Sequence, residues 1–209
     1  PMMLSMLVNS LYNIVDSYFV AQISEQAMTA LSLVYPLQLL ETAIAVGFGI
    51  GINAAAAFYL GAGERKNAND VVTSGTLLSI VHGIVLTLFS IGFARYFVGM
   101  FTDQQPILED AVKYAWIVFA FTIPNVVAIT FEKIFQAEGR MKVSMISMLC
   151  GCVVNIILDP MLIFGIGFFP KMGIAGAALA TGIGQVIPLV VYIIIFVNIL
   201  PHIHVHNFI

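Results

Sequence analysis

Long apolar segments alternate with short polar turns along the whole chain. Six of these segments are long enough to cross a bilayer as helices, because a membrane-spanning helix needs about 20 mostly apolar residues. The pattern predicts an all-α polytopic membrane protein, a bundle of six transmembrane helices within residues 1–201. The predicted spans are roughly 2–21, 28–58, 70–99, 109–137, 143–166 and 173–199. Residues 202–209 are expected to form a cytoplasmic tail or the start of a linker between lobes.

The composition agrees with a membrane protein, because 60% of the 209 residues are hydrophobic and only 9% are charged. Soluble globular chains carry about 25% charged residues. The chain has a net charge of −3 and no basic tract, so we expect no nucleic-acid partner. It has no nucleophile elbow, phosphate-binding Walker loop or HExxH motif. We therefore predict that it is not an enzyme and uses no organic cofactor.

The positive charges of the turns predict the orientation of the bundle. Arg65 and Lys66 lie in the second turn and Arg140 and Lys142 in the fourth, whereas the odd-numbered turns carry few Lys or Arg residues. Loops rich in Lys and Arg remain in the cytoplasm. Both ends of the chain are thus predicted to be cytoplasmic, in a plasma membrane such as the bacterial inner membrane. The sequence starts inside an apolar run, so we expect it to be a fragment of a longer protein.

Two acidic residues, Asp16 and Asp159, lie inside predicted spans. Each has an asparagine about one turn away on the same helix face, Asn13 and Asn155 respectively. An acid at the centre of a membrane helix costs roughly 2.5–3.5 kcal/mol on insertion scales, and such residues usually mark an ion or proton path. Pro160 follows Asp159 directly and leaves one backbone carbonyl without its donor, so we predict a hinge there.

Helix geometry brings further polar residues to the same depth. At a rise of about 1.5 Å per residue, Asp16, Asp159 and Thr181 all lie in the outer half of the bundle. Tyr35 and Tyr114 are predicted at a similar depth and are candidates for the wall of a substrate cavity. We expect Asp16 and Asp159 to face each other across a small polar pocket. Oxygen ligands suit a proton or Na⁺ and not zinc.

Two glutamates inside the spans are further cavity candidates. Glu41 is the stronger candidate for attracting cationic substrates. Glu132 lies in the inner part of its span, and the neighbouring Lys133 is expected to extend toward the membrane interface. Three alternating histidines at positions 202–206 offer no closed ligand set, so no metal site other than one for Na⁺ is predicted.

The chain resembles the multidrug and toxic compound extrusion (MATE) family. The resemblance covers essentially the whole chain, and the order and spacing of its motifs carry it. These motifs are 13–20 (NIVDSYFV), 61–63 (GAG), 138–140 (EGR), 155–160 (NIILDP) and 173–181 (GIAGAALAT). The resemblance implies one lobe of a two-lobe transporter that exchanges organic cations for H⁺ or Na⁺. It places the essential acid of the first helix at Asp16 and the second polar cluster at Asn155, Asp159 and Thr181, with Tyr114 nearby.

The predicted function is a cation-coupled antiporter that exports organic cations and is present here as its N-terminal half. Its expected partners are the lipid bilayer, organic cations and a second six-helix lobe, from a missing C-terminal half or another copy. Asp16 would bind the coupling ion, H⁺ or Na⁺, and Asn13, Asn155, Asp159 and Thr181 would tune its affinity. The alternative is a lipid-linked precursor flippase of the same superfamily, which would need basic residues in its cavity. A structural membrane subunit without a cavity is a third interpretation.

Overall fold

The computed structural model describes residues 2–167 and 169–199, and the predicted tail at 202–209, with its alternating histidines, lies outside them. Within the described residues the chain is helical, with no strand, which confirms the predicted all-α fold class. The helices are α1 (Met2–Ala21), α2 (Glu25–Gly61), α3 (Arg65–Gly99), α4 (Gln105–Ala120), α5 (Thr122–Ala137), α6 (Met141–Phe164) and α7 (Ile174–Ile199).

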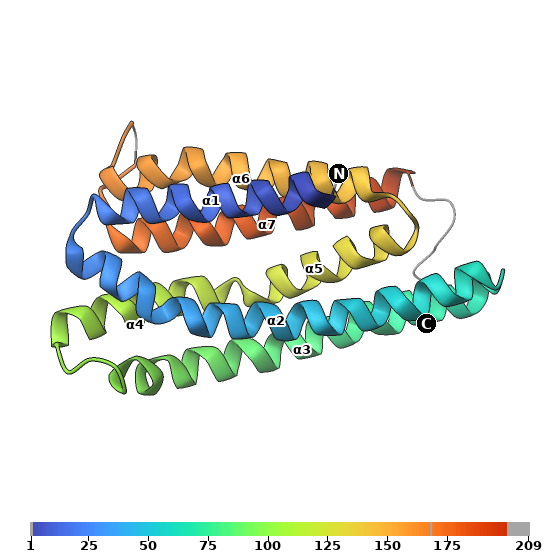
Figure 1. The fold of residues 1–209 in the computed structure, drawn as a ribbon, viewed down its shortest axis with the longest axis horizontal. Helices are drawn as coiled ribbons and strands as arrows, with labels where there is room; N and C mark the ends of the chain where they lie inside the picture. The colour runs from blue at the N-terminus through green and yellow to red at the C-terminus, as the bar shows by residue number, and fades with distance from the viewer. Residues whose placement is uncertain (1, 168, 200–209) are drawn as a thin grey trace.

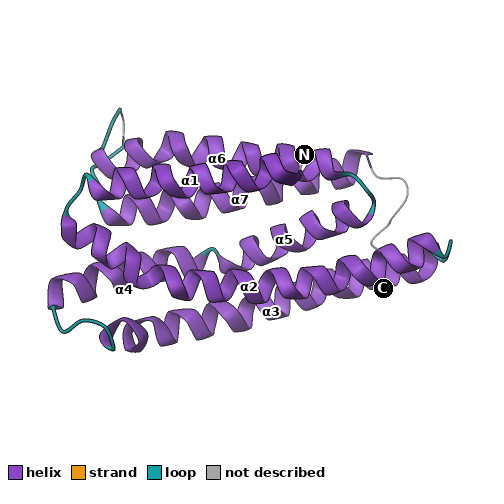
Figure 2. Cartoon of the chain, viewed as in Figure 1, coloured by secondary structure: helices purple, strands orange, loops and turns teal. Residues whose placement is uncertain are grey.

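The helices run up and down and form two layers (Figure 1). One layer consists of α1, α6 and α7, and the other of α2, α3 and the consecutive pair α4 and α5. Helices α4 and α5 contact α7 and thereby join the layers. Short turns connect most helices (Figure 2). The turns after α1, α3 and α6 lie at one end of the molecule, and those after α2 and α5 at the other (Figure 1).

Local sequence sets the ends of the helices. Helix α2 begins where the Ser24 side chain accepts a hydrogen bond from the backbone N–H of Ala27, which satisfies one donor of the first turn. Helix α6 ends at Gly165, whose φ of +74° is in the left-handed region that favours glycine. Between these ends, α2 and α6 are each a single uninterrupted helix.

The lengths and compositions of the helices fit a multi-pass membrane protein. Helices α2, α3, α6 and α7 are each long and apolar enough to cross a membrane, and α4 with α5 makes a fifth candidate if the pair is one span. Helix α1 is not in this set, because Asn9, Ser10, Asn13 and Asp16 interrupt its apolar sequence, but it lies beside α6 (Figure 1). Helices α2 and α3 have 37 and 35 residues, so they exceed the bilayer core unless they tilt.

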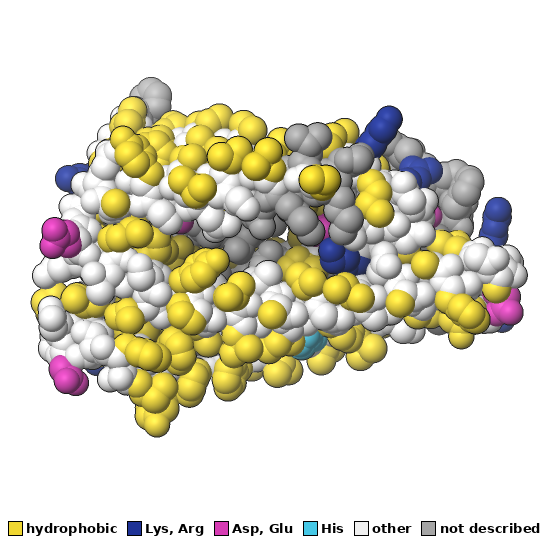
Figure 3. Space-filling model, in the orientation of Figure 1, with side chains coloured by type: hydrophobic (Ala, Val, Ile, Leu, Met, Phe, Trp, Pro, Cys, Tyr) yellow, Lys and Arg dark blue, Asp and Glu magenta, His cyan; other side chains and the backbone are white. Residues whose placement is uncertain are grey.

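The surface shows the same division between apolar and charged regions. On the face drawn in Figure 3, hydrophobic side chains cover the middle of the molecule and most charged side chains lie at its two ends. Large apolar residues such as Leu88, Phe58 and Val197 are more than two-thirds exposed in the absence of lipid. The bilayer would cover such a surface.

The predicted fourth span, 109–137, consists of two helices rather than one. Helices α4 and α5 meet at Phe121 with a bend of 49°. Pro124 explains the break, because it has no N–H to donate to the carbonyl of Ala120 and its ring crowds that carbonyl. By contrast, α6 continues through Pro160 and α2 through Pro36. The hinge assigned to Pro160 therefore does not interrupt its helix in this conformation, and its role stays a prediction.

Glycines allow α6 and α7 to approach until their backbones are in contact. A Cβ atom at Gly176 would lie 2.5 Å from the carbonyl oxygen of Leu162, and one at Gly151 would lie 2.5 Å from the carbonyl oxygen of Gly184. A Cβ at Gly184 would lie 2.9 Å from the Cβ of Asn155. The approach thus fixes the position of Asn155 relative to α7.

We predict that Gly176→Ala destabilises the protein, because the new methyl group would meet backbone atoms that cannot rotate away. The expected loss is about 1–3 kcal/mol of unfolding free energy, the usual cost of overpacking. Thermal unfolding in detergent measures it. Gly92→Ala in α3 is the matched control, because nothing lies within 4 Å of its added Cβ. Equal stability of the two variants would contradict the close α6–α7 contact.

Candidate functional site: a polar cavity between the helix layers

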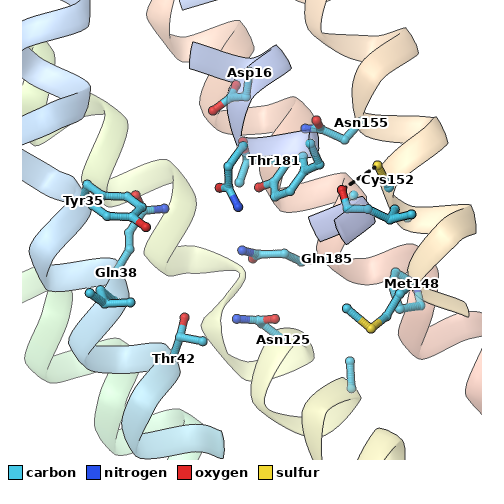
Figure 4. A pocket seen from close by; sticks show the side chains of 18 of the residues that line it. Asp16, Tyr35, Gln38, Thr42, Asn125, Met148, Cys152, Asn155, Thr181 and Gln185 are labelled. Atoms are coloured by element: carbon cyan, nitrogen blue, oxygen red, sulfur yellow. Dashed lines mark hydrogen bonds between the residues drawn. The ribbon is translucent and has the colours of Figure 1, made fainter. Parts of the chain in front are cut away.

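A cavity of about 770 Å³ lies between the two layers, and six helices contribute to its wall. They are α1, α2, α4, α5, α6 and α7. Figure 4 shows Tyr35 and Thr42 on the α2 side, with Asn155, Thr181 and Gln185 on the side of α6 and α7. The cavity has an apolar lining interrupted by hydroxyl, amide and carboxyl groups, which is the usual composition of a small-molecule site.

Helix α1 contributes Asp16 to the cavity wall. Asp16 is five residues from the end of α1 and is only 6% exposed. Tyr12 lies one helical turn earlier, lines the same cavity, and is close enough to Asp16 and Thr181 to interact with both. The thiol of Cys152 donates a 3.7 Å hydrogen bond to the carbonyl of Val8 and connects α1 to α6 (Figure 4).

Helices α6 and α7 contribute the second half of the cluster. Asn155, Asp159 and Thr181 are 1%, 0% and 2% exposed. The Asn155 side-chain N–H donates to Asp159 Oδ1 at 3.5 Å, a long hydrogen bond one turn along α6. Asp159 lies within electrostatic reach of Asp16 and Tyr12. Asn155 and Thr181 line the cavity, whereas Asp159 does not and lies behind its wall.

Several oxygen atoms in this cluster are buried without a hydrogen-bond partner among the described residues. They are Asp16 Oδ1, Asn155 Oδ1, Asp159 Oδ2 and Thr181 Oγ1. The Thr181 hydroxyl lies beside the phenol groups of Tyr12 and Tyr114 but not at hydrogen-bonding geometry. Buried polar atoms nearly always have a partner, because losing water without a replacement costs free energy. Four such oxygens close together indicate a candidate binding site for a ligand that interacts with oxygen atoms.

The chemistry of these oxygens limits what can bind there. Carboxylate, amide and hydroxyl oxygens suit a hard monovalent cation, and a proton on a carboxyl group would use them as acceptors. No group of three His, Cys, Asp or Glu residues within the described part of the chain could hold a metal ion. The donors therefore fit Na⁺ or a proton and do not resemble a transition-metal site.

The remaining predicted residues lie at different places. Tyr114 is 1% exposed, lies within electrostatic reach of Asp16 and lines the cavity, and Asn13 and Tyr35 also line it. Glu132 lines the cavity as well. Glu41, which the sequence analysis offered as a possible cavity residue, is not among the lining residues: it is 6% exposed and its carboxyl group lies near Thr122, the first residue of α5. The rotation of α2 turns Glu41 toward the α4–α5 break, whereas Gln38, three residues earlier, faces the cavity.

Among the polar cavity residues that the sequence interpretation missed are Tyr12, Gln38, Asn125 and Gln185. Tyr12 and Gln185 each lie four residues from a predicted site residue, Asp16 and Thr181, so the helical period could have found them. Gln38 lies near Tyr114, and Asn125 follows the proline that breaks the α4–α5 pair. The position of Asn125 in the cavity wall could not be predicted from the helical period, because it depends on the bend between α4 and α5. All four line the cavity.

Comparison with known proteins gives a family match over most of the chain. The MatE family model matches residues 1–161. The chain is 28% identical over 175 residues to an FAD transporter of Shewanella oneidensis, covering 81% of this chain and 38% of that protein. It is 29% identical over 197 residues to the multidrug export protein MepA of Staphylococcus haemolyticus, covering 94% of this chain and 43% of that protein.

A solved structure has the same fold. It is a multidrug resistance MATE family transporter of the MOP superfamily in an outward-facing conformation, with a TM-score of 0.87 and 28% sequence identity. The match covers 95% of this chain and 43% of that one. The chain therefore spans about two-fifths of the length of the proteins that it matches.

We predict that Asp159→Asn stabilises the protein by about 1–3 kcal/mol in a buffer without Na⁺. An amide is neutral and removes the cost of burying a carboxylate that has one oxygen without a partner. Chemical unfolding in detergent measures the change. Asp103→Asn at the exposed end of the bundle is the control and should stay within about 0.5 kcal/mol. A loss of stability in Asp159→Asn would show that the carboxylate has a structural partner.

Proposed function

Because this chain belongs to the MatE family, we propose that it is one lobe of a membrane transporter that exports organic cations in exchange for H⁺ or Na⁺. The observation that carries the coupling proposal is the group of four unpartnered oxygens around Asp16 and Asp159. The activity belongs to an assembly with a second six-helix lobe, from a longer form of this chain or from another copy.

The coupling ion would act through the first helix. Asp16 lies on α1, whereas Asn155 and Asp159 lie on α6 and Thr181 on α7. A cation or proton bound between them favours the arrangement in which these helices stay together. Its release leaves the carboxylates unneutralised and favours separation of α1 from α6. A ligand that binds one arrangement better shifts the population toward it, which would couple the ion to the direction of access.

The charge of the cavity favours cationic cargo. Of the described residues that line it, Asp16 and Glu132 are the charged ones, and both are acidic. An anionic cargo such as a lipid pyrophosphate or FAD would be repelled unless basic groups of the second lobe supplied the compensation. The flippase alternative therefore lacks the basic wall that it would need in this lobe.

We predict that Asp16→Asn abolishes efflux of a cationic dye by cells that express the complete transporter. The amide cannot take up a proton and carries no charge for Na⁺. Fluorescence of the retained dye measures efflux, and Asp103→Asn is the charge-matched control. Normal efflux by Asp16→Asn at equal expression would refute the assignment of Asp16. Transport of a lipid pyrophosphate without inhibition by organic cations would favour the flippase.

A separate measurement distinguishes the two coupling ions. If Na⁺ binds the cluster, it should raise the unfolding temperature of the purified chain by mass action, whereas N-methylglucamine chloride at equal ionic strength should not. The Na⁺ effect should be absent from Asp16→Asn. An equal response to both salts, with efflux that follows the pH gradient, would assign the coupling to H⁺.

A further inference from the structure

The far end of the cavity contains a second carboxyl group with its own cation. Glu132 lines the cavity and lies five residues before the end of α5, whereas Asp16 lies five residues before the end of α1. The two helices end at opposite ends of the molecule (Figure 1). Glu132 and Asp16 therefore belong to different levels of the same cavity.

Lys133 is turned onto Glu132 and does not extend to the membrane interface, which differs from the expectation from the sequence. Its Nζ donates to Glu132 Oε1 at 3.1 Å and to Gln136 Oε1 at 3.3 Å. The Gln136 side-chain N–H donates to the same Glu132 oxygen at 2.6 Å. The Lys133 and Glu132 side chains are 11% and 18% exposed, so both are largely out of water.

The surrounding helices hold Lys133 in this position. Gly49 of α2 leaves room for the lysine stem, because a Cβ there would lie 2.9 Å from Lys133 Cγ. The Asn53 side-chain N–H donates to the Lys133 backbone carbonyl at 2.7 Å. Glu132 faces the cavity, whereas Lys133 is not one of its lining residues. The carboxylate is thus presented to the cavity while its counter-ion approaches from behind.

We propose that the Glu132 carboxylate binds the positive charge of the cargo, and that Lys133 is a tethered counter-ion that neutralises Glu132 when no cargo is present. This inference rests on the proposed function and names a cargo-binding group within it. The Lys133 ammonium and the Gln136 amide both donate to Glu132 Oε1, so Oε2 takes no part in these bonds. A cationic cargo could therefore bind the part of the carboxylate charge that Lys133 does not neutralise. A neutral cargo gains nothing from the carboxylate, so the pair selects for positive charge.

The proposed pair predicts opposite effects on cation binding when Glu132 or Lys133 is replaced. Removing the carboxylate removes the attraction for a cation. Removing the lysine leaves a partly buried carboxylate without its cation, which makes the binding of an external cation more favourable. If the pair only stabilised the fold, the loss of either member would weaken binding through the same structural damage.

The test measures equilibrium binding of tetraphenylphosphonium, a permanent cation, to the 209-residue chain in lipid nanodiscs. Triphenylphosphine oxide serves as the neutral probe. We expect Glu132→Gln to weaken binding of the cation roughly tenfold and Lys133→Met to strengthen it about threefold. Neither variant should change binding of the neutral probe, which also shows that the cavity has formed. The double variant should bind the cation more weakly than the wild type, and Lys133→Arg should bind it like the wild type.

Charge-matched controls separate a local effect from a change in net charge. Glu109→Gln and Lys142→Met alter exposed residues outside the cavity and should leave the affinity for the cation unchanged. Weaker or unchanged cation binding by Lys133→Met would overturn the role of Lys133, and an unchanged Glu132→Gln would overturn the role of Glu132. A wild-type chain that binds the neutral probe but not the cation would overturn the proposed cargo class as well. If Asp16→Asn abolishes efflux while the Glu132 variant binds normally, only this inference fails.

Discussion

The backbone contact between α6 and α7 is the constraint on which the polar cluster depends. Gly151, Gly176 and Gly184 allow the contact, because a Cβ at any of them would lie 2.9 Å or less from atoms of the facing helix. At this separation Asn155 and Asp159 of α6 come to the same level as Thr181 of α7. Without water in the bilayer core, van der Waals packing and such close contacts take over the role that the hydrophobic effect has in soluble proteins.

The cavity lies between the two layers, beside this tight pair. The break at Phe121 separates α4, which brings Tyr114 within electrostatic reach of Asp16, from α5, which places Asn125 and Glu132 along the wall. Pro124 prevents a continuous helix, and the packing of Glu41 beside Thr122 occupies the broken region from the α2 side. A polar side chain inside a span can therefore support helix geometry or serve a cavity, and the choice depends on which way it faces.

The acidic side chains at the two ends of the cavity differ in their partners. At one end, Asp16 and Asp159 have no basic side chain among their described interactions, and their oxygens lack partners. At the other end, Glu132 has Lys133 at 3.1 Å and Gln136 at 2.6 Å. A buried carboxylate without a partner is destabilising, and binding an ion relieves that cost. A carboxylate paired with a lysine is already partly neutralised, so another cation must compete with the lysine to bind it. This difference is the basis of our proposals that the Asp16 end binds the coupling ion and that Glu132 binds the cargo.

The fold class could be predicted from the amino-acid sequence, as could most of the residues that the structure brings together around Asp16. Apolar length and helical period are local properties, so they predicted the helices and a common depth for Asp16, Asp159 and Thr181. The resemblance to a transporter family came from the order and spacing of short motifs. Tertiary structure alone decided which face of each helix meets the cavity. Rotation about the helix axis placed Glu41 against α5 and Asp159 behind the wall, and the bend before Pro124 brought in Asn125. Contacts between distant helices set these rotations, and no pattern within one helix records them.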